Sequence, residues 1–317
     1  MARVLPWKLI NDSHVSNANS AKEVMQLAGL DWTVSLHDVS VEHETGLLEV
    51  PGKFATVRTN KDGTASALSV VGGRYNIFQN DEIFSSLDYL IDSGEARYSA
   101  AGDIDGGKIV WMVMELPDSV KIAGDEHAGY LLARTSHDGS TAFQIAPIIS
   151  RLSCTNQMNA AFADADKRGG LYSLKHTQNN VVRVEDIRNI IKVMYKDFSV
   201  YEDMAHEFMG QGMNDGEFKN FIRKVYPMSS KIEFSSDELL SPAEKRTRAA
   251  VERNRSNAWL VWTGDTQDNL RYSKFGALHA VVEVADHYSR SYEKASSKIL
   301  LSKDGAVKQK AIQLLNY

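Results

Sequence analysis

Short alternating or apolar runs fill the first half of the chain, and three Asp-Gly turns separate them. The turns are Asp62-Gly63, Asp105-Gly106 and Asp138-Gly139. Asp-Gly tolerates the positive φ angles that tight hairpins require, so each turn predicts a β-hairpin. The run Ile109–Met114 is apolar on both sides of a strand, which predicts a strand that is central or covered by a helix.

Helix signals lie between and after these hairpins. Ser20–Glu23 forms a capping box, and Gly29 ends the short helix that it opens. A second helix is expected at about Asp81–Asp92 with Asn80 as its N-cap, and a third at Cys154–Ala165. The first half is therefore predicted to be an antiparallel sheet of hairpins with helices on one face, an α+β arrangement.

From about Val184 onward the apolar residues recur with a period of 3.6, which predicts an all-helical C-terminal region. The polar stretch His176–Asn180 marks the boundary between an α+β domain at residues 1–180 and a helical domain at residues 181–317. The later helices are expected to open at Asn214 and at the Ser241–Glu244 capping box, to run to about Trp262, and to cover about Leu270–Tyr288 and Ser291–Leu301.

Composition narrows the class of protein. The 317 residues are 43% hydrophobic and 24% charged, which is typical of a globular protein. A lone Cys154 excludes a disulfide within the chain and a multi-cysteine zinc site, and fits a reducing compartment. Met1–Asn11 is too short and too polar for a signal peptide, and no apolar run is long enough to span a membrane. We therefore expect a soluble, intracellular protein without a membrane segment.

The net charge and the local charge distribution point in different directions on nucleic-acid binding. The net charge of −5 argues mildly against nucleic-acid binding, which usually shows a basic surface. Residues 130–183 nevertheless hold six Lys/Arg against three Asp/Glu, and residues 241–255 hold five against two, while residues 184–240 are acidic. Each basic stretch is explained equally well by a solvated helix face or by a surface that binds an anion.

No pattern of catalytic residues is recognisable. Asp103–Gly106 resembles the start of a calcium loop, but Met114 occupies the position of the required Glu, so a hairpin turn is the better interpretation. His137 and Asp138 have no identifiable nucleophile beside them, which favours turn chemistry, and Cys154 is better explained as a core residue. The histidines lack metal-ligand spacing. We expect no enzyme activity, metal or cofactor.

Basic and aromatic residues supply a different hypothesis. Arg151 ends a predicted strand, and the residues that follow would open a helix whose free N–H groups suit phosphate. Cations interleaved with aromatic rings are typical of single-strand grooves. The candidate DNA-binding residues are Arg74, Tyr75, Arg151, Asn156, Gln157, Lys167, Arg168, Lys175 and His176. A solvated basic loop with a structural helix cap explains much of the same set.

Several segments, in their order and spacing, resemble the phage/plasmid-like protein family, whose common domain has no known function. The matching segments are Ala28–Val34, Val70–Tyr75, Gln79–Phe84, Ala96–Tyr98, Ser136–Ser140, Arg151–Gln157, Lys175–Thr177 and the late helix Ala277–His287. Met1–Asn19 does not match the extended glycine-containing start of many members. The resemblance implies a bacteriophage, plasmid or bacterial island as the setting, and the cytoplasm of the bacterial host cell as the compartment.

The predicted order of hairpin, helix, hairpin, hairpin, helix is similar to the core of phage single-strand annealing proteins of the RecT, Erf and Redβ kind. Those proteins form rings or filaments that hold single-stranded DNA and help complementary strands pair. The resemblance implies a homo-oligomeric recombination accessory that binds and anneals single strands. The alternative is a non-enzymatic protein-interaction module of a mobile element, for example a counter-defence protein that binds a host factor. The acidic net charge and the helical second half suit that alternative.

Overall fold

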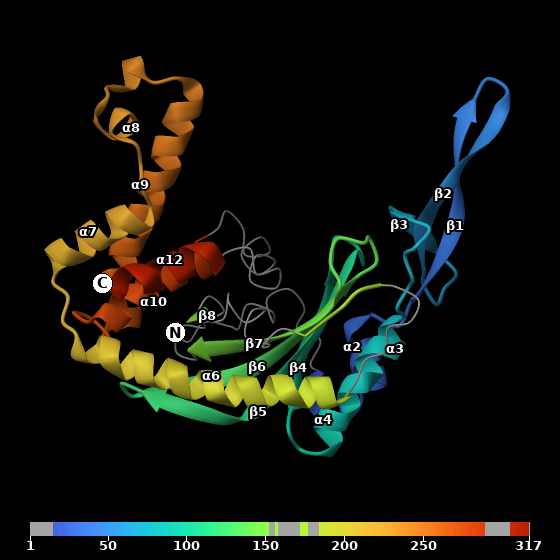
Figure 1. Ribbon diagram of the computed structural model, residues 1–317, viewed down its shortest axis with the longest axis horizontal. Helices are drawn as coiled ribbons and strands as arrows, with labels where there is room; N and C mark the ends of the chain where they lie inside the picture. Colours follow the sequence, from blue (N-terminus) through green and yellow to red (C-terminus); the bar gives the residue numbers. More distant parts are fainter. Residues whose placement is uncertain (1–14, 152–155, 158–171, 177–183, 289–304, 317) are drawn as a thin grey trace.

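The first half of the chain forms two antiparallel sheets and the second half is mostly helical, which confirms the predicted α+β class (Figure 1). The computed structural model describes residues 15–151, 156–157, 172–176, 184–288 and 305–316. The boundary predicted near residue 180 lies outside the described residues. The main apolar core contains side chains from both halves, so the sheets and the helices share one core.

The smaller sheet has three strands and carries a projecting hairpin. Its order is β1 (Thr33–His43), β2 (Gly46–Thr59) and β3 (Ala65–Gly72). The turn at Asp62-Gly63 joins β2 to β3, as predicted, and Gly63 has φ 83°. The distal parts of β1 and β2, residues 36–50, form a ribbon that we call the hairpin arm, and most of this ribbon extends beyond β3 (Figure 1).

The larger sheet has six strands. Its path is β4-β5-β6-β7-β8, and β9 pairs with β7. The strands are β4 (Arg97–Ile104), β5 (Ile109–Ile122), β6 (Asp125–Ser136), β7 (Phe143–Arg151), β8 (Asn156–Gln157) and β9 (Tyr172–Leu174). The turns at Asp105-Gly106 and Asp138-Gly139 lie between β4 and β5 and between β6 and β7, which confirms both predicted hairpins. β8 and β9 pair with opposite ends of β7.

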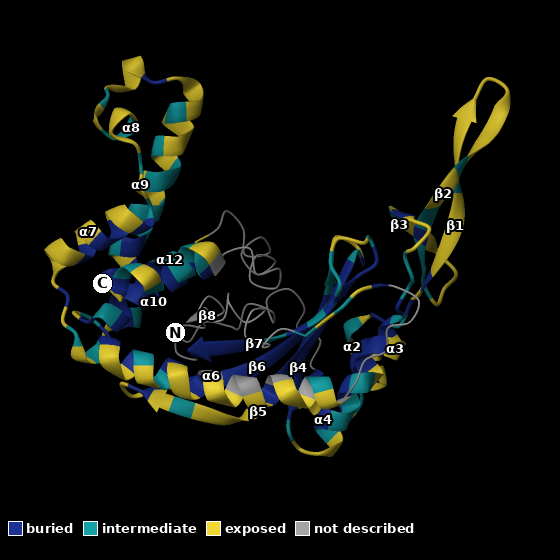
Figure 2. Cartoon of the chain, viewed as in Figure 1, coloured by how far each residue is buried: buried dark blue, intermediate teal, exposed yellow. Residues whose placement is uncertain are grey.

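Both faces of the larger sheet are buried (Figure 2). Along β5, Val110, Met112 and Met114 belong to the main core, whereas Trp111 and Val113 belong to a second cluster on the opposite face. This confirms the prediction for Ile109–Met114. Burial of each such side chain contributes about 1.5–3 kcal/mol to folding.

The helices described within residues 15–92 lie close to the predicted ones, but the helix expected at Asp81–Asp92 is divided into three short segments. They are η1 (Val15–Asn17), α2 (Ala21–Ala28), α3 (Asn80–Phe84), η2 (Ser85–Leu87) and α4 (Asp88–Asp92). Ser20 caps α2 and Gly29 ends it at φ 68°, as expected. Asn80, however, is not an N-cap. Its buried side chain donates to Leu30 O at 2.9 Å and lies 2.9 Å from His137 Nε2, so long-range bonds replace the local cap.

The second half begins with a long helix that lies along one face of the larger sheet (Figure 1). The elements are α6 (Val184–Gly210), α7 (Asp215–Val225), α8 (Ser230–Phe234), η4 (Asp237–Leu239), α9 (Pro242–Trp262), η5 (Asp265–Gln267), α10 (Lys274–His287) and α12 (Gly305–Leu315). Capping boxes open α7 and α9, as predicted. α10 begins later than expected, because Tyr272 has φ 63° and Ser273 is the N-cap. The predicted helix Ser291–Leu301 lies outside the described residues.

A buried ion pair joins the end of the larger sheet to the helices. The Arg151 side chain on β7 is 2% exposed and binds the carboxylate of Asp125 on β6. Its Nη1 also donates to the carbonyl oxygen of Thr266 in η5 at 3.0 Å. Arg151 was predicted to bind phosphate, and this expectation is corrected, because burial and these bonds give its guanidinium a structural role.

Two histidines and a tyrosine extend this polar joint into the core. Tyr201 Oη on α6 lies 2.9 Å from His127 Nδ1 on β6 and 3.5 Å from His279 Nε2 on α10. Burial, helped by the charge of Arg151, lowers the pKa of His127 to about 3. Burial and the same charge hold the pKa of His279 well below its ordinary value. Both rings are therefore neutral where the sheet meets the helices.

A second buried ion pair lies among the C-terminal helices. Lys308 on α12 binds Asp286 on α10, and both side chains are fully buried. α10 is buried along most of its length and contacts α6, α9 and α12. Charged groups thus fix how the last helices pack, because burial makes an unpaired charge costly.

We predict that Asp125→Ala destabilises the fold by about 3–5 kcal/mol, because it leaves the buried guanidinium of Arg151 without its counter-ion. The double variant Asp125→Leu, Arg151→Met is expected to recover most of this loss, since no charge remains to be desolvated. Urea unfolding followed by circular dichroism measures both. A single variant as stable as the wild type would contradict the structural role of the pair.

Stability is predicted to fall on the acid side through His127. An unfolded histidine titrates near 6.5 and the folded one near 3, so the unfolded chain binds more protons between these values. The stabilisation is complete above about pH 6.5 and is lost as the pH falls toward 3, by about 1.4 kcal/mol per pH unit for one group. His127→Gln should flatten the dependence of the unfolding free energy between pH 6.5 and 4.5 by that amount. An unchanged slope would contradict the assignment.

Candidate nucleic-acid interface

Four of the nine predicted DNA-binding residues meet at one surface hollow. The hollow has a volume of about 730 Å³ and lies where the end of β3, the turn between β6 and β7 and the end of β9 come together. It is lined by Val70, Val71, Gly72, Gly73, Arg74, Tyr75, Asp138, Gly139, Lys175 and His176. Arg74, Tyr75, Lys175 and His176 thus form a single surface.

Backbone pairing positions these residues. β9 pairs with the start of β7, with Leu174 opposite Phe143, so that Lys175 and His176 follow directly at this edge. Asn76 N donates to His176 O at 3.1 Å, and His176 Nδ1 lies 3.2 Å from Asn76 O. These two bonds join segments that are 100 residues apart in sequence.

Two stacked rings support the hollow. The rings of Tyr75 and His176 lie 5.0 Å apart with an interplanar angle of 13°, and Phe78 packs 4.7 Å from His176. Tyr75 Oη donates to Ser136 O at 2.7 Å, and His176 Nε2 lies 3.1 Å from Thr135 Oγ1. His176 is therefore a buried support, whereas Tyr75 is only partly covered.

Cations stand at the rim of this hollow. Arg74 and Lys175 are exposed. Lys53 on β2 is exposed too, and the register of β2 and β3 sets it opposite Gly72. Sequence reasoning missed Lys53, because only this register brings it near Arg74. Asp138 is the carboxylate of the hollow, and its Oδ1 accepts from Ser140 N at 2.9 Å in the turn.

The histidines of this region are neutral. Burial, with a contribution from His176, lowers the pKa of His137 to about 4. Burial also lowers the pKa of His176, against a hydrogen bond to Asn76 that raises it. Asp138 bonds within its turn, as the sequence suggested, whereas the His137 side chain lies 2.9 Å from Asn80 and so contacts a residue outside the turn. Positive charge in the hollow therefore comes from Arg74 and Lys175, and Lys53 adds an exposed cation opposite Gly72.

The remaining predicted residues are not part of this surface. β8, with Asn156 and Gln157, pairs with Ser150 and Arg151 at the far end of β7. β7 has nine residues, so its ends are roughly 25 Å apart. Asn156 and Gln157 were expected to open a helix, but they form a strand, so the helix N-terminus proposed for phosphate is wrong at these two residues. Lys167 and Arg168 lie outside the described residues.

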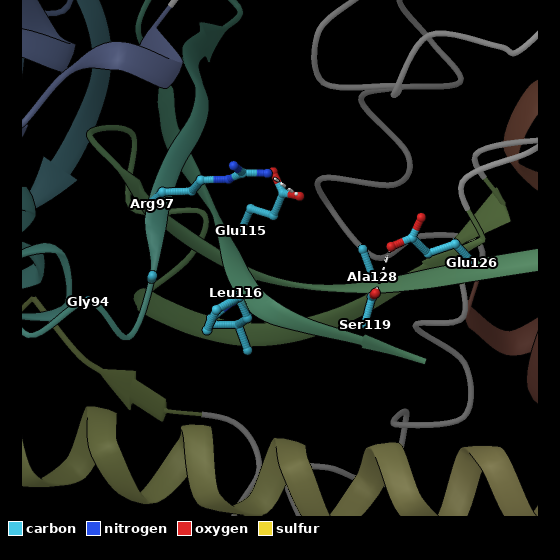
Figure 3. Close-up of a pocket in the computed structure, with 9 residues that line it drawn as sticks. Gly94, Arg97, Glu115, Leu116, Ser119, Glu126 and Ala128 are labelled. Atoms are coloured by element: carbon cyan, nitrogen blue, oxygen red, sulfur yellow. Dashed lines mark hydrogen bonds and ion pairs between the residues drawn. The ribbon is translucent and has the colours of Figure 1, made fainter. Parts of the chain in front are cut away.

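A second hollow, of about 370 Å³, lies over β4, β5 and β6 (Figure 3). Arg97 lines it and binds Glu115 through Nη2 at 2.9 Å and Nε at 3.2 Å. This carboxylate raises the pKa of Arg97 above its usual value. Ser119 Oγ donates to Glu126 Oε1 at 2.7 Å in the same hollow. With two carboxylates and one paired cation, this hollow suits an anionic ligand less well than the first one.

Among the residues that the structure describes, no group of three His, Cys, Asp or Glu side chains could hold a metal ion. None of the described helices has the length and apolar character needed to cross a bilayer.

Comparison with known proteins gives one match. No curated protein and no solved structure matches the chain. A family model, described as a domain of unknown function (DUF932), matches residues 67–313. This range includes the larger sheet, most of the residues around the first hollow and the C-terminal helices, and it begins after the hairpin arm. The chain therefore belongs to the DUF932 family of domains of unknown function.

Proposed function

We propose that this protein binds single-stranded DNA as a homo-oligomer and helps complementary strands to pair during recombination of a phage or plasmid in the bacterial cytoplasm. The observation that carries the proposal is the meeting of Arg74-Tyr75 with Lys175-His176 around one hollow. Further support comes from the resemblance to the phage/plasmid-like family and to phage annealing proteins.

The chemistry of the hollow fits a flexible single strand. Arg74, Lys175 and Lys53 would contact phosphates, and the partly covered Tyr75 ring would offer a surface to a base or sugar. Asp138, which also lines the hollow, would repel phosphate but can accept a hydrogen bond from a base amino group. Such contacts need unpaired bases, so the hollow favours single strands over a duplex.

One subunit offers too few cations to bind a single strand tightly. Three phosphate contacts on a single strand give a slope of only about −2 in log affinity against log salt. Several subunits that hold one strand together would add their contacts at high effective concentration. The proposal therefore requires an oligomer in order to bind tightly at physiological salt.

A second candidate function is the protein-interaction module expected from the net acidic charge. Exposed apolar side chains favour it, among them Leu47 at 77% exposed on the hairpin arm and Phe234 at 83% in α8. Under this second hypothesis, the partner is a host or phage protein rather than DNA.

We predict that Arg74→Glu, Lys175→Glu weakens binding to labelled oligo-dT by at least about tenfold at low salt, because two phosphate contacts become repulsive. Fluorescence anisotropy at several salt concentrations measures the affinity and its slope. The matched control is Lys192→Glu, Lys196→Glu, which reverses two exposed charges on α6 and should retain wild-type affinity.

The outcomes separate the site from the function. If the wild type binds the single strand and the double variant binds equally well, the site is wrong although the function stands. If the wild type binds neither strand at low salt, the DNA-binding proposal fails and the protein-interaction module is favoured.

A further inference from the structure

The hairpin arm is exposed on both faces. Within residues 36–50, Leu47 is 77% exposed, Val41 50% and Leu48 45%, and the arm stands clear of the rest of the chain (Figure 2). A two-stranded ribbon is marginally stable by itself in water. Its unpaired edges and exposed apolar side chains are also features of association surfaces. The arm therefore has the features of a surface that contacts another protein.

The register of the arm gives its faces different chemistry. Val41 lies opposite Leu48, so these two side chains share one face. Glu42 lies opposite Leu47 and Ser40 opposite Glu49, so the other face combines two carboxylates with the most exposed leucine of the arm. The arm also carries Asp38 and Glu44, and it contains no Lys or Arg.

At the opposite end of the molecule, α8 and α9 form a second projection (Figure 1). Three ion pairs hold α8 and its neighbouring loop on one side of α9, namely Lys231–Glu244, Arg248–Asp237 and Arg255–Glu233. These pairs neutralise that side of α9. The side of α9 that faces away from α8 therefore determines the charge of the surface that the projection exposes.

That other side carries a basic stripe. Arg246, Arg253 and Leu260 are exposed and follow one another at intervals of seven residues, which puts them on one face of α9. Among the described residues, no ion pair involves Arg246 or Arg253. The small exposed residues Ala249, between Arg246 and Arg253, and Ser256, between Arg253 and Leu260, lie on the same face and leave room for a backbone to approach.

The two surfaces match in charge and in spacing. Arg246 and Arg253 are about 10 Å apart along the helix. The diagonal pair Glu42 and Glu49 is about 7–8 Å apart across the ribbon, within reach of long arginine side chains. Leu47 on the acidic face can meet Leu260 on the stripe. Because the two surfaces lie at opposite ends of one chain, a single copy cannot join them (Figure 1).

We propose that the acidic face of the hairpin arm of one copy docks on the basic stripe of α9 in the next copy. This contact is heterologous, since two different surfaces meet, and it builds a ring if the rotation closes or a filament if it does not. It supplies the oligomer on which the proposed DNA-binding function rests, but it needs no DNA to form.

The test is a charge swap read by sedimentation velocity without DNA. Glu42→Lys, Glu49→Lys and, separately, Arg246→Glu, Arg253→Glu should each raise the concentration needed for assembly by about tenfold or more, because like charges then face each other. An equimolar mixture of the two variants should assemble again, since each reversed surface meets its complement on the other variant. Lys192→Glu, Lys196→Glu is the matched control and should assemble as the wild type does.

Circular dichroism melts of each variant check that the subunit is folded, and recovery in the mixture cannot come from unfolded chains. Assembly of both variants at wild-type concentrations, absence of recovery on mixing, or a wild type that stays monomeric would each overturn the proposal. Because assembly is measured without DNA, failure here leaves the oligo-dT result intact. Failure of DNA binding likewise leaves the contact between copies intact.

Discussion

The buried guanidinium of Arg151 lies where the two halves of the chain meet. Its partners come from β6 and η5, so a single charge joins strands formed by the first half to helices formed by the second. A buried cation tolerates few arrangements, because each missing partner costs several kcal/mol. The neighbouring His127, Tyr201 and His279 continue the joint from β6 through α6 to α10. Polar bonds thus set the orientation of the helices, and apolar packing supplies the bulk of the stability.

This joint and the candidate DNA surface occupy opposite ends of β7, and they use similar residues differently. At the joint, arginine and histidine are buried and paired with protein groups. At the hollow, Arg74 and Lys175 are exposed beside rings that are held by hydrogen bonds to the backbone and to Thr135. A rigid floor under exposed cations costs little to organise when a ligand arrives, because the rings are already held in place.

Local signals in the sequence predicted much of this fold. Asp-Gly turns predicted three hairpins, and the run Ile109–Met114 predicted a strand buried on both faces. Capping boxes predicted the starts of α2 and α9, and Asn214 predicted the start of α7. Features that depend on distant partners were missed. Asn80 bonds to Leu30 and His137 rather than capping its helix. Arg151 resembled an exposed strand end, because nothing local reveals that Asp125 lies beside it. The hollow itself depends on the pairing of β9 with β7. A strand of only three residues gives too weak a sequence pattern for this pairing to be predicted.

The burial of both faces of the larger sheet limits how a nucleic acid can approach it. A strand cannot lie flat across the sheet, because Trp111 and Val113 are covered on one side and Met112 and Met114 on the other. The first hollow lies at the rim of the sheet instead, where the ends of β3 and β9 meet the turn between β6 and β7. The footprint of one subunit would then be no more than a few nucleotides. A longer strand would have to pass from rim to rim, so the spacing between neighbouring subunits would set the pitch at which its bases are presented for pairing.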